Sequence, residues 1–532
     1  MDVLRFTSRR PGQAKSIPQS GLYGFGLRRP VLFAGFVLCA LLSQVALAVV
    51  PGGTISVRCD PQVQTAPYTG RVYLFFSEPR GAQTGEEPRH GPSWFDPQPF
   101  LSRDVTNWQP GEAVTFSLSD PAVRRFPAEL TPEMLQGRQL QAVVRFNPHV
   151  PEIGTGPGNG YSAVAALKDS GPVELVVNSL VPEQAFPENQ WTKLLRIRSD
   201  KLSRFHDRDV YLQGAVTLPA SYYKEPQRRY PVIIEVPGFG GDHLHRVRSE
   251  PVKESNSHGV EFIRVMLDPK CGLGHHVFAN SANNGPYGDA LVEEFLPALN
   301  SQFRTTGTPE GRFLTGHSSG GWSSLWLQVN YPEQFAGTWS TAPDPVDFRD
   351  FQQIDLYRSG ENMFTDPKGG RRPLARMRGE PIVFYDTFSQ MEDVLGDGGQ
   401  LRSFEAVFSR RGADGQPVQL WDRLTGKIDP AVAESWQPYD IRLQLEKNWP
   451  ALGPKLQGKL HVYMGTEDTF YLEGATRLLK ESLARMGSDA HVELIPGRNH
   501  MNLFADGLHG RIENEMAAKF QSPADHNLQN LK

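Results

Sequence analysis

The residues best suited to chemistry surround a serine in a short glycine-rich segment. Residues 312–316 are typical of a strand, and they lead into Gly-His-Ser-Ser-Gly with the central serine at Ser318. Residues 322–329 then have the composition of a helix. A Gly-x-Ser-x-Gly turn between a strand and a helix strains the serine and exposes its hydroxyl, as a nucleophile requires. The segment therefore predicts a nucleophilic Ser318, with the N–H of Ser319 facing a developing oxyanion. An ordinary turn with a solvated serine is the alternative.

A nucleophilic serine needs a base and an acid, and candidates for both follow the last two strands that the sequence predicts. Asp468 follows the first of these strands, and His500 follows the second. Imidazole can take the proton of Ser318 near neutral pH, and a carboxylate fixes its tautomer and stabilises the imidazolium. The order serine, acid, histidine at the carboxyl ends of strands predicts a catalytic triad. Glu467 is an alternative acid, and so is Asp344, which follows the preceding strand.

A second oxyanion donor is expected in the loop 237–241, Pro-Gly-Phe-Gly-Gly. This loop follows a nearly continuous β-branched strand, 231–236, whose composition suits burial on both faces. A glycine-rich loop upstream of the serine can aim a backbone N–H at the oxyanion. Phe239 is the predicted donor and Gly240 the alternative, and we assign Gly240 and Trp322 to substrate binding. An ordinary flexible loop is the other interpretation.

The elements around these residues alternate between strand and helix over 186–520. Strands are predicted at 210–218, 230–236, 261–267, 312–316, 336–340, 459–465 and 491–495, and helices near 289–296, 322–329, 472–486 and 510–520. Such alternation predicts an α/β domain, with a mostly parallel sheet covered by helices on both faces. The stretch 344–458 is too long for a loop in a compact sheet. It predicts an insertion, either a cap over the site or helical decoration away from it.

Residues 49–185 predict a separate β-sandwich domain of immunoglobulin-like type. Strands are predicted at 54–59, 70–76, 113–118, 140–146 and 173–177, with proline and glycine in the loops between them. Two loops, 89–95 and 156–161, are aromatic. Their tryptophan and tyrosine are expected either to contact sugars or a neighbouring active site, or to close the ends of the sandwich.

The first 48 residues have the layout of a secretory signal. Arg28 and Arg29 precede an apolar stretch, 31–48, that ends in Ala-Leu-Ala. This layout predicts cleavage after Ala48 and an exported protein, periplasmic or secreted, with no stable membrane insertion afterwards. An uncleaved N-terminal anchor is the alternative. The polar residues 521–532 predict a disordered tail.

The composition of the chain limits the kinds of partner that it is expected to bind. It has 532 residues, of which 39% are hydrophobic and 21% charged, and a net charge of −4. These values are typical of a globular protein of two or three domains and argue against nucleic acid as a partner. Beyond the signal there are two cysteines, Cys59 and Cys271, and the sequence decides neither whether they pair nor the oligomeric state.

Two pairs of histidines invite a metal interpretation. His243 and His245 form His-x-His, and His275 and His276 are adjacent. No matching cluster of cysteines or carboxylates accompanies them in the sequence, so neither a metal nor another cofactor is expected.

Residues 209–510 resemble the "Putative esterase" family of α/β-hydrolases in its bacterial secreted branch; feruloyl and acetylxylan esterases, esterase D and mycolyltransferases belong to that family. The resemblance rests on YPVIIEVPGFGG from Tyr230, Ala-Asn-Ser at 279–281 through Gly285, the GHSSGGW segment, Gly-Thr-Glu-Asp at 465–468, and Asn499-His500. It implies an α/β-hydrolase fold in which the triad and the oxyanion donors named above serve their predicted roles. It also implies that Asn280 lies at the rim of the substrate pocket. The N-terminal β-domain and the insertion depart from the family, so its substrates do not carry over.

The sequence thus predicts an exported serine esterase that cleaves carboxylic esters through an acyl-enzyme. Small-molecule or polysaccharide esters are the expected substrates, polysaccharide on the strength of export, the aromatic loops and family analogy. An acyltransferase or a peptidase on the same fold is an alternative. A non-catalytic protein that binds carbohydrate or protein on the same scaffold is another.

Overall fold

The computed structural model describes residues 54–79, 86–167, 172–252 and 256–522 of the chain. The predicted signal, 1–48, and most of the predicted tail lie outside these residues.

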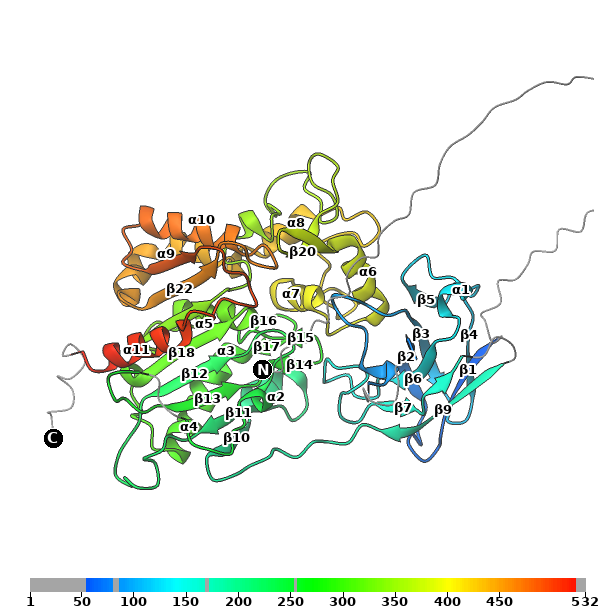
Figure 1. The fold of residues 1–532 in the computed structure, drawn as a ribbon, viewed down its shortest axis with the longest axis horizontal. Helices are drawn as coiled ribbons and strands as arrows, with labels where there is room; N and C mark the ends of the chain where they lie inside the picture. Colours follow the sequence, from blue (N-terminus) through cyan, green and yellow to red (C-terminus); the bar gives the residue numbers. More distant parts are fainter. Residues whose placement is uncertain (1–53, 80–85, 168–171, 253–255, 523–532) are drawn as a thin grey trace, which may run out of the picture. The chain divides into compact units, whose positions relative to one another are not determined.

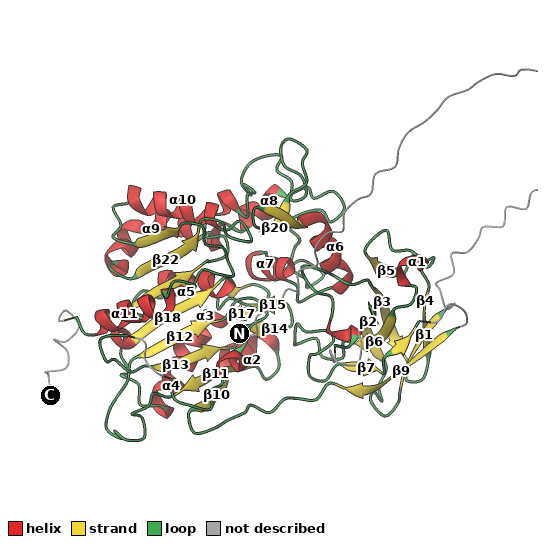
Figure 2. Ribbon diagram, viewed as in Figure 1, coloured by secondary structure: helices red, strands yellow, loops and turns green. Residues whose placement is uncertain are grey.

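An eight-stranded sheet forms the centre of the α/β part of the chain (Figures 1 and 2). From one edge to the other, its strands are β10 (Thr192–Arg198), β11 (Tyr211–Thr217), β13 (Ile263–Leu267), β12 (Val232–Val236), β18 (Arg312–His317), β19 (Gly337–Thr341), β22 (Leu460–Gly465) and β23 (His491–Ile495). The pairs β10–β11 and β11–β13 are antiparallel, and all the others are parallel. The sheet is therefore mostly parallel, as predicted. Because these strands run parallel, the loops after β18, β22 and β23 lie together at the carboxyl ends of the strands.

Both faces of this sheet are covered. On the central strand β18, Phe313 belongs to a buried cluster with Met516 of α11 (Leu508–Phe520), whereas Leu314 belongs to a second cluster with Leu299 of α4 (Leu296–Gln302). The other helical elements of this part are α2 (Asp200–His206), η2 (His243–Arg246), α3 (Tyr287–Ala290), the π-helical η3 (Leu291–Phe295), η4 (Pro309–Gly311), α5 (Ser319–Asn330), α9 (Ile441–Leu456) and α10 (Glu473–Arg485). Because successive residues of a strand point to opposite faces, this two-sided cover explains the nearly unbroken apolar strands.

The N-terminal part is β-rich, as predicted. Its strands follow one hydrogen-bonded path: β4 (Ala113–Phe116), β1 (Ile55–Cys59), β9 (Val173–Leu180), β7 (Gly160–Ser162), β6 (Gln139–Val144), β2 (Tyr68–Ser77), β3 (Phe100–Trp108) and β5 (Val123–Phe126), with β8 (Ala165–Ala166) beside β6. Val57 and Leu175 from one half of the path share a buried cluster with Leu74 and Leu101 from the other half. The two halves therefore enclose one core, although the short β7 joins them into a single sheet. The immunoglobulin-like connectivity stays a prediction.

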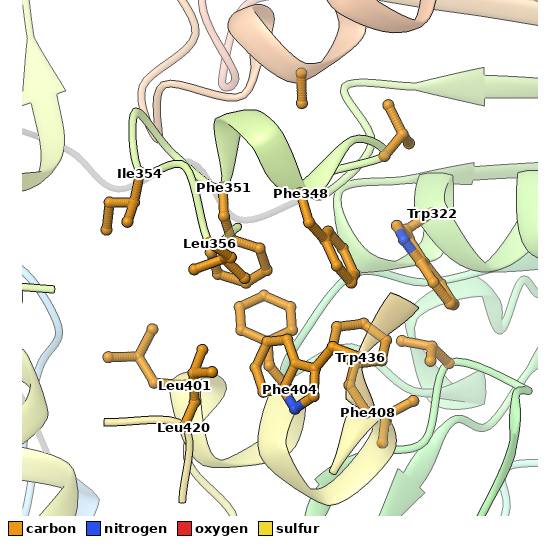
Figure 3. Close-up of a cluster of buried hydrophobic side chains, with 14 of the residues drawn as sticks. Trp322, Phe348, Phe351, Ile354, Leu356, Leu401, Phe404, Phe408, Leu420 and Trp436 are labelled. Carbon is orange, nitrogen blue, oxygen red and sulfur yellow. The ribbon is translucent and has the colours of Figure 1, made fainter. Parts of the chain in front are cut away.

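The segment between β19 and β22 shares one buried core with helix α5 and with the β-rich part. It contains the hairpin β20 (Pro373–Met377) and β21 (Glu380–Phe384), the helices α6 (Tyr385–Leu395), α7 (Gln400–Phe408) and α8 (Pro430–Ser435), and the short turns η5 (Phe348–Asp350) and η6 (Gln437–Tyr439). Figure 3 shows its aromatic rings gathered beside helix α5. The ring of Phe408 lies 5.1 Å from that of Trp436 and 5.3 Å from that of Trp322 on α5. The last helix, α9, contacts α5 and belongs to the cover of the sheet.

The β-rich part is joined to this insertion by buried polar contacts. The hydroxyl of Tyr73 donates to the carbonyl of Leu395 at 2.6 Å, and the hydroxyl of Ser102 donates to that of Val394 at 2.7 Å. These carbonyls end helix α6, where a helix leaves acceptors without intrahelical partners. Phe100 of β3 and Phe388 of α6 also belong to one buried cluster. The two parts are thus packed together rather than tethered.

Across the described ranges, none of the helices combines the length and apolar composition needed to cross a membrane.

Candidate active site

Ser318 lies in a strained turn between β18 and α5. Its φ of 60° and ψ of −127° are rarely adopted by a residue with a side chain. The turn requires the flanking glycines, because a Cβ on Gly316 would lie 2.1 Å from the carbonyl oxygen of Gly320. A Cβ on Gly320 would lie 1.9 Å from the carbonyl oxygen of Val236. The turn is the geometry that the Gly-x-Ser-x-Gly segment predicts, and Ser318 itself is partly exposed.

The glycine-rich loop after β12 lies against this serine. A Cβ on Gly238 would be 3.2 Å from the Cβ of Ser318. The N–H of Gly241 donates to the carbonyl of Gly238, and Gly240 has a φ of 80°, so a tight turn holds Phe239 at its tip. Ser319 opens helix α5, and a residue at that position has no intrahelical acceptor for its N–H. Both predicted oxyanion donors are therefore on segments that adjoin Ser318.

A buried histidine contacts the glycine-rich loop 237–241. Nε2 of His275 lies 2.9 Å from the carbonyl oxygen of Pro237. Burial lowers the pKa of His275 to about 4, so the imidazole is neutral near pH 7 and donates its proton to this carbonyl. From the sequence, the only role suggested for His275 is that of a metal ligand. Its contact with Pro237 could not be predicted, because it joins two loops that are distant in sequence.

Asp468 and His500 form a buried pair at the carboxyl ends of the strands, where Ser318 also lies. Oδ2 of Asp468 lies 2.8 Å from Nδ1 of His500, and Oδ1 accepts the N–H of Phe470 at 2.8 Å. The aspartate is fully buried and the histidine nearly so. Burial alone would lower the pKa of His500, but the Asp468 carboxylate outweighs it and the pKa is raised above its ordinary value. The competing Glu467 is exposed.

Aromatic and imidazole rings enclose His500. Its ring centre lies 4.5 Å from that of His317, which immediately precedes Ser318. On another side the ring of Phe470 meets it edge-on at 4.9 Å. Burial, together with the neighbouring His500, lowers the pKa of His317 well below its usual value, so His317 is a neutral neighbour of His500 near pH 7. These contacts fix the ring of His500 beside the turn that carries Ser318.

A second carboxyl group, that of Asp344, lies at the turn. Oδ2 of Asp344 accepts the hydroxyl of Ser319 at 2.5 Å, and its N–H donates to the carbonyl of Ser318. Burial raises the pKa of Asp344 to about 6, against the opposing effects of the Ser319 hydroxyl and of His500. Asp344 is therefore not the hydrogen-bond partner of Nδ1 of His500, which is Asp468. It is a buried group that changes charge within the range where an imidazole also titrates.

The insertion contributes two polar contacts to the site. Nε of Arg376, on β20, donates to the carbonyl of Asp468 at 3.0 Å, and Nε2 of Gln400, on α7, lies 3.4 Å from Oγ of Ser319. Neither residue is among the candidates that the sequence suggests. Nothing in their local sequence distinguishes them from surface residues, since only the folded insertion brings them here.

The predicted substrate-binding residues have different surroundings. Trp322 is 1% exposed and stacks on Trp326, with the ring centres 5.1 Å apart, so it is part of the core in Figure 3. Gly240 is exposed beside Phe239. The side-chain amide of Asn280 is exposed and donates to the hydroxyl of Tyr331 at 3.1 Å.

The remaining histidine and cysteine candidates make other contacts. His276 stacks on Tyr287 at 3.5 Å, and Nδ1 of His245 lies 3.0 Å from a carboxylate oxygen of Asp242. Within the described part of the chain, no group of three or more histidine, cysteine or acidic side chains is arranged to hold a metal ion. Cys59 and Cys271 are unpaired, and burial raises the pKa of the first to about 11 and that of the second to about 12.

Solved structures similar to this chain include a ferulic acid esterase, at 12% identity and a TM-score of 0.37, covering 62% of this chain and 100% of the other. An S-formylglutathione hydrolase from Agrobacterium tumefaciens matches at 13% identity and 0.36, covering 64% and 98%. A putative dipeptidyl aminopeptidase IV from Bacteroides ovatus matches at 12% identity and 0.36, covering 79% of this chain and 47% of the other.

A sequence model of the family described as "Putative esterase" matches residues 209–510. This range contains the serine turn, the Asp468–His500 pair and the eight-stranded sheet from β11 onwards. It is more than half of the chain, which therefore belongs to the Putative esterase family of carboxylic ester hydrolases with the α/β-hydrolase fold.

Proposed function

We propose that this enzyme is a serine esterase in which Ser318 is the nucleophile, His500 the base and Asp468 the acid. The observation that carries the proposal is that these groups meet at the carboxyl ends of the strands of one sheet. There, a strained serine adjoins a glycine loop, and a buried aspartate is bonded to Nδ1 of a histidine that packs beside the serine turn. Family membership independently supports ester hydrolysis.

In the proposed mechanism, Oγ of Ser318 attacks the ester carbonyl carbon while its proton passes to Nε2 of His500. Asp468 holds Nδ1–H and stabilises the imidazolium that forms. The tetrahedral intermediate collapses when the bond to the alcohol oxygen breaks and His500 returns the proton to that oxygen. Water then attacks the acyl-enzyme, giving its proton to His500, and the carboxylic acid leaves as Oγ regains a proton.

The backbone N–H groups of Phe239 and Ser319 would bind the oxyanion. One comes from the tip of a tight turn and the other from the first position of helix α5, where the helix dipole adds to the hydrogen bond. Because backbone donors are fixed before the reaction, they stabilise the developing charge without reorganising. Ser318 itself is partly exposed, so an ester can approach it.

We further propose that the chain is exported after cleavage behind Ala48 and that it deacylates polysaccharide. Support comes from the basic and apolar pattern of residues 28–48 and from the aromatic loops of the β-domain. N-terminal sequencing of the mature protein tests the cleavage. Release of acetate from an acetylated polysaccharide, compared with a small acetate ester, tests the substrate class.

The first experiment compares residues 49–532 with the variant Ser318→Ala on p-nitrophenyl acetate. Loss of the nucleophile is expected to lower kcat by about 10⁴-fold or more. Ser301→Ala, an exposed serine on α4, is the matched control and should keep its activity. A fluorophosphonate probe should label the wild-type chain and Ser301→Ala but not Ser318→Ala. Equal hydrolysis by wild type and Ser318→Ala would reject the assignment.

A further inference from the structure

The loop 89–95 of the β-domain carries two adjacent aromatic residues that contact residues flanking the candidate active site. Trp94 lies against the oxyanion loop: its ring centre is 5.2 Å from that of Phe239, with 30° between the planes. Phe388 of helix α6 also contacts the indole of Trp94, edge-on and at 5.4 Å between ring centres. Trp94 is thus held between the insertion and the residue whose N–H is the proposed oxyanion donor.

The next residue, Phe95, lies on the histidine side of the site. Its ring centre is 6.3 Å from that of Phe470, and the planes are nearly parallel at 28°. Phe470 in turn meets His500 edge-on at 4.9 Å. Two consecutive residues of the β-domain therefore contact neighbours of the reaction centre: Trp94 contacts Phe239 in the oxyanion loop, and Phe95 contacts Phe470 beside the base.

The ester must bind between the oxyanion loop and the base. Its carbonyl oxygen has to face Phe239 and Ser319, while its alcohol oxygen has to be within reach of His500. A Cβ added to Gly238, the neighbour of Phe239, would lie 3.2 Å from the Cβ of Ser318, so this loop runs close to the proposed nucleophile. A substrate group that leaves the carbonyl carbon toward the β-domain therefore meets the rings of Trp94 and Phe95.

The loop is anchored so that these rings are in place before a substrate arrives. The N–H of Arg89 donates to Oε1 of Gln141 at 3.1 Å, and its Nη1 donates to the carbonyl of Gly154 at 2.7 Å. Trp94 is partly buried, and Phe95 remains 36% exposed. A fixed aromatic surface that stays partly open to solvent costs little ordering on binding, and it favours a flat apolar partner.

We propose that Trp94 and Phe95 form a specificity-determining wall of the active site, which selects esters carrying a flat apolar group next to the reacting carbonyl. The N-terminal β-domain is then part of the substrate site. This inference rests on the proposed esterase function and adds to it the residues that choose the substrate.

The test measures kcat/KM for two pairs of esters. p-Nitrophenyl benzoate against p-nitrophenyl acetate varies the acyl group, and benzyl acetate against ethyl acetate varies the alcohol. The wild-type chain is expected to prefer the aromatic member of at least one pair. In Trp94→Ala and Phe95→Ala that preference should fall about three- to tenfold, the range of a lost aromatic contact.

Two further variants keep the test decisive. Trp94→Phe retains a ring and should restore most of the preference, which a purely structural role would not predict. Met134→Ala removes an exposed apolar side chain of the same β-domain and should leave both ratios unchanged. Thermal melting of each variant shows whether it is folded.

The outcomes separate this inference from the function on which it rests. Fluorophosphonate labelling of wild type, together with ester ratios that do not differ between wild type and Trp94→Ala, would reject the aromatic wall and keep the esterase. A wild-type preference for the aliphatic member of both pairs would also reject the wall. Absence of labelling at Ser318 in the wild-type chain would reject the esterase and the wall together.

Discussion

The strand ends of the α/β sheet and the segments added to the α/β core position the residues of the site in different ways. At the strand ends, the backbone itself fixes the geometry, because a Cβ at Gly316 or Gly320 would collide with a carbonyl oxygen. The added segments reach the site through side chains. The rings of Trp94 and Phe95 and the guanidinium of Arg376 contact loops that the α/β core provides.

From this difference we expect the strand ends to determine the reaction rate and the added segments to determine which substrates are selected. Backbone geometry at strand ends is suited to hold the proposed nucleophile, base and oxyanion donors in place, because catalysis tolerates little misplacement. Side-chain contacts between distant segments can vary without disturbing that geometry, so they suit recognition and fine adjustment. Substitutions at the strand ends should therefore change kcat by orders of magnitude. Substitutions in the added segments should have smaller effects on kcat or on substrate preference.

After Ser318→Ala, the largest effect is expected for Asp468→Asn. The amide cannot stabilise the imidazolium, and its NH₂ group can donate to Nδ1 of His500, which favours the tautomer without a proton on Nδ1. We therefore expect kcat on p-nitrophenyl acetate to fall by about 10³- to 10⁴-fold. Glu467→Gln is the matched control, because Glu467 is the neighbouring, exposed carboxylate. A larger loss in Glu467→Gln than in Asp468→Asn would reverse the assignment of the acid.

The strand ends could be predicted from the sequence because their signals are local. The glycines around Ser318 and the apolar runs of β18, β22 and β23 each lie within a few residues of the group that they position. The sheet and the Asp468–His500 pair follow from these signals and the rules for parallel strands.

The side-chain contacts of the added segments could not be predicted in the same way. Arg376 and Gln400 act through the tertiary fold of the insertion, and His275 contacts a carbonyl on a distant loop. Strand β3 could not be predicted either, because its second half, residues 103–107, is mostly polar and lacks a clear apolar alternation. For loop 89–95, aromatic composition indicated a role at a neighbouring site or in closing the sandwich, but not which of the two.

An intermediate effect is expected for Arg376→Ala. The variant loses the donor to the carbonyl of Asp468 and the ion pair with Glu473, so the loop that carries the acid becomes looser. We expect kcat to fall about tenfold with little change in KM, because misplacing a catalytic group costs rate rather than binding. Arg378→Ala removes an exposed arginine from the same hairpin and should have no such effect. Equal kcat in both variants would show that the hairpin does not position Asp468.

The smallest effect is expected for Asp344→Asn, and it concerns pH. The acid limb of kcat/KM reports the pKa of the free enzyme's base, which we propose is His500. Burial lowers this pKa, whereas the charges of Asp468 and, more weakly, Asp344 raise it. Removing the charge of Asp344 favours neutral imidazole, so the acid limb should move to lower pH.

The shape of that limb tests the coupling more strictly than its position. Burial raises the pKa of Asp344 to about 6, so in the wild-type chain the charge that supports His500 is itself lost as the pH falls. Two groups that influence each other titrate as a pair, which broadens the limb. In Asp344→Asn only His500 titrates, and the limb should sharpen to a single ionisation. Asp366→Asn, a solvated carboxyl in the insertion, is the control and should leave the profile unchanged. A limb that keeps its position and breadth in Asp344→Asn would show that the two groups are electrostatically independent. Asp344 would then serve only to hold the Ser319 hydroxyl, which asparagine can also do through its amide oxygen.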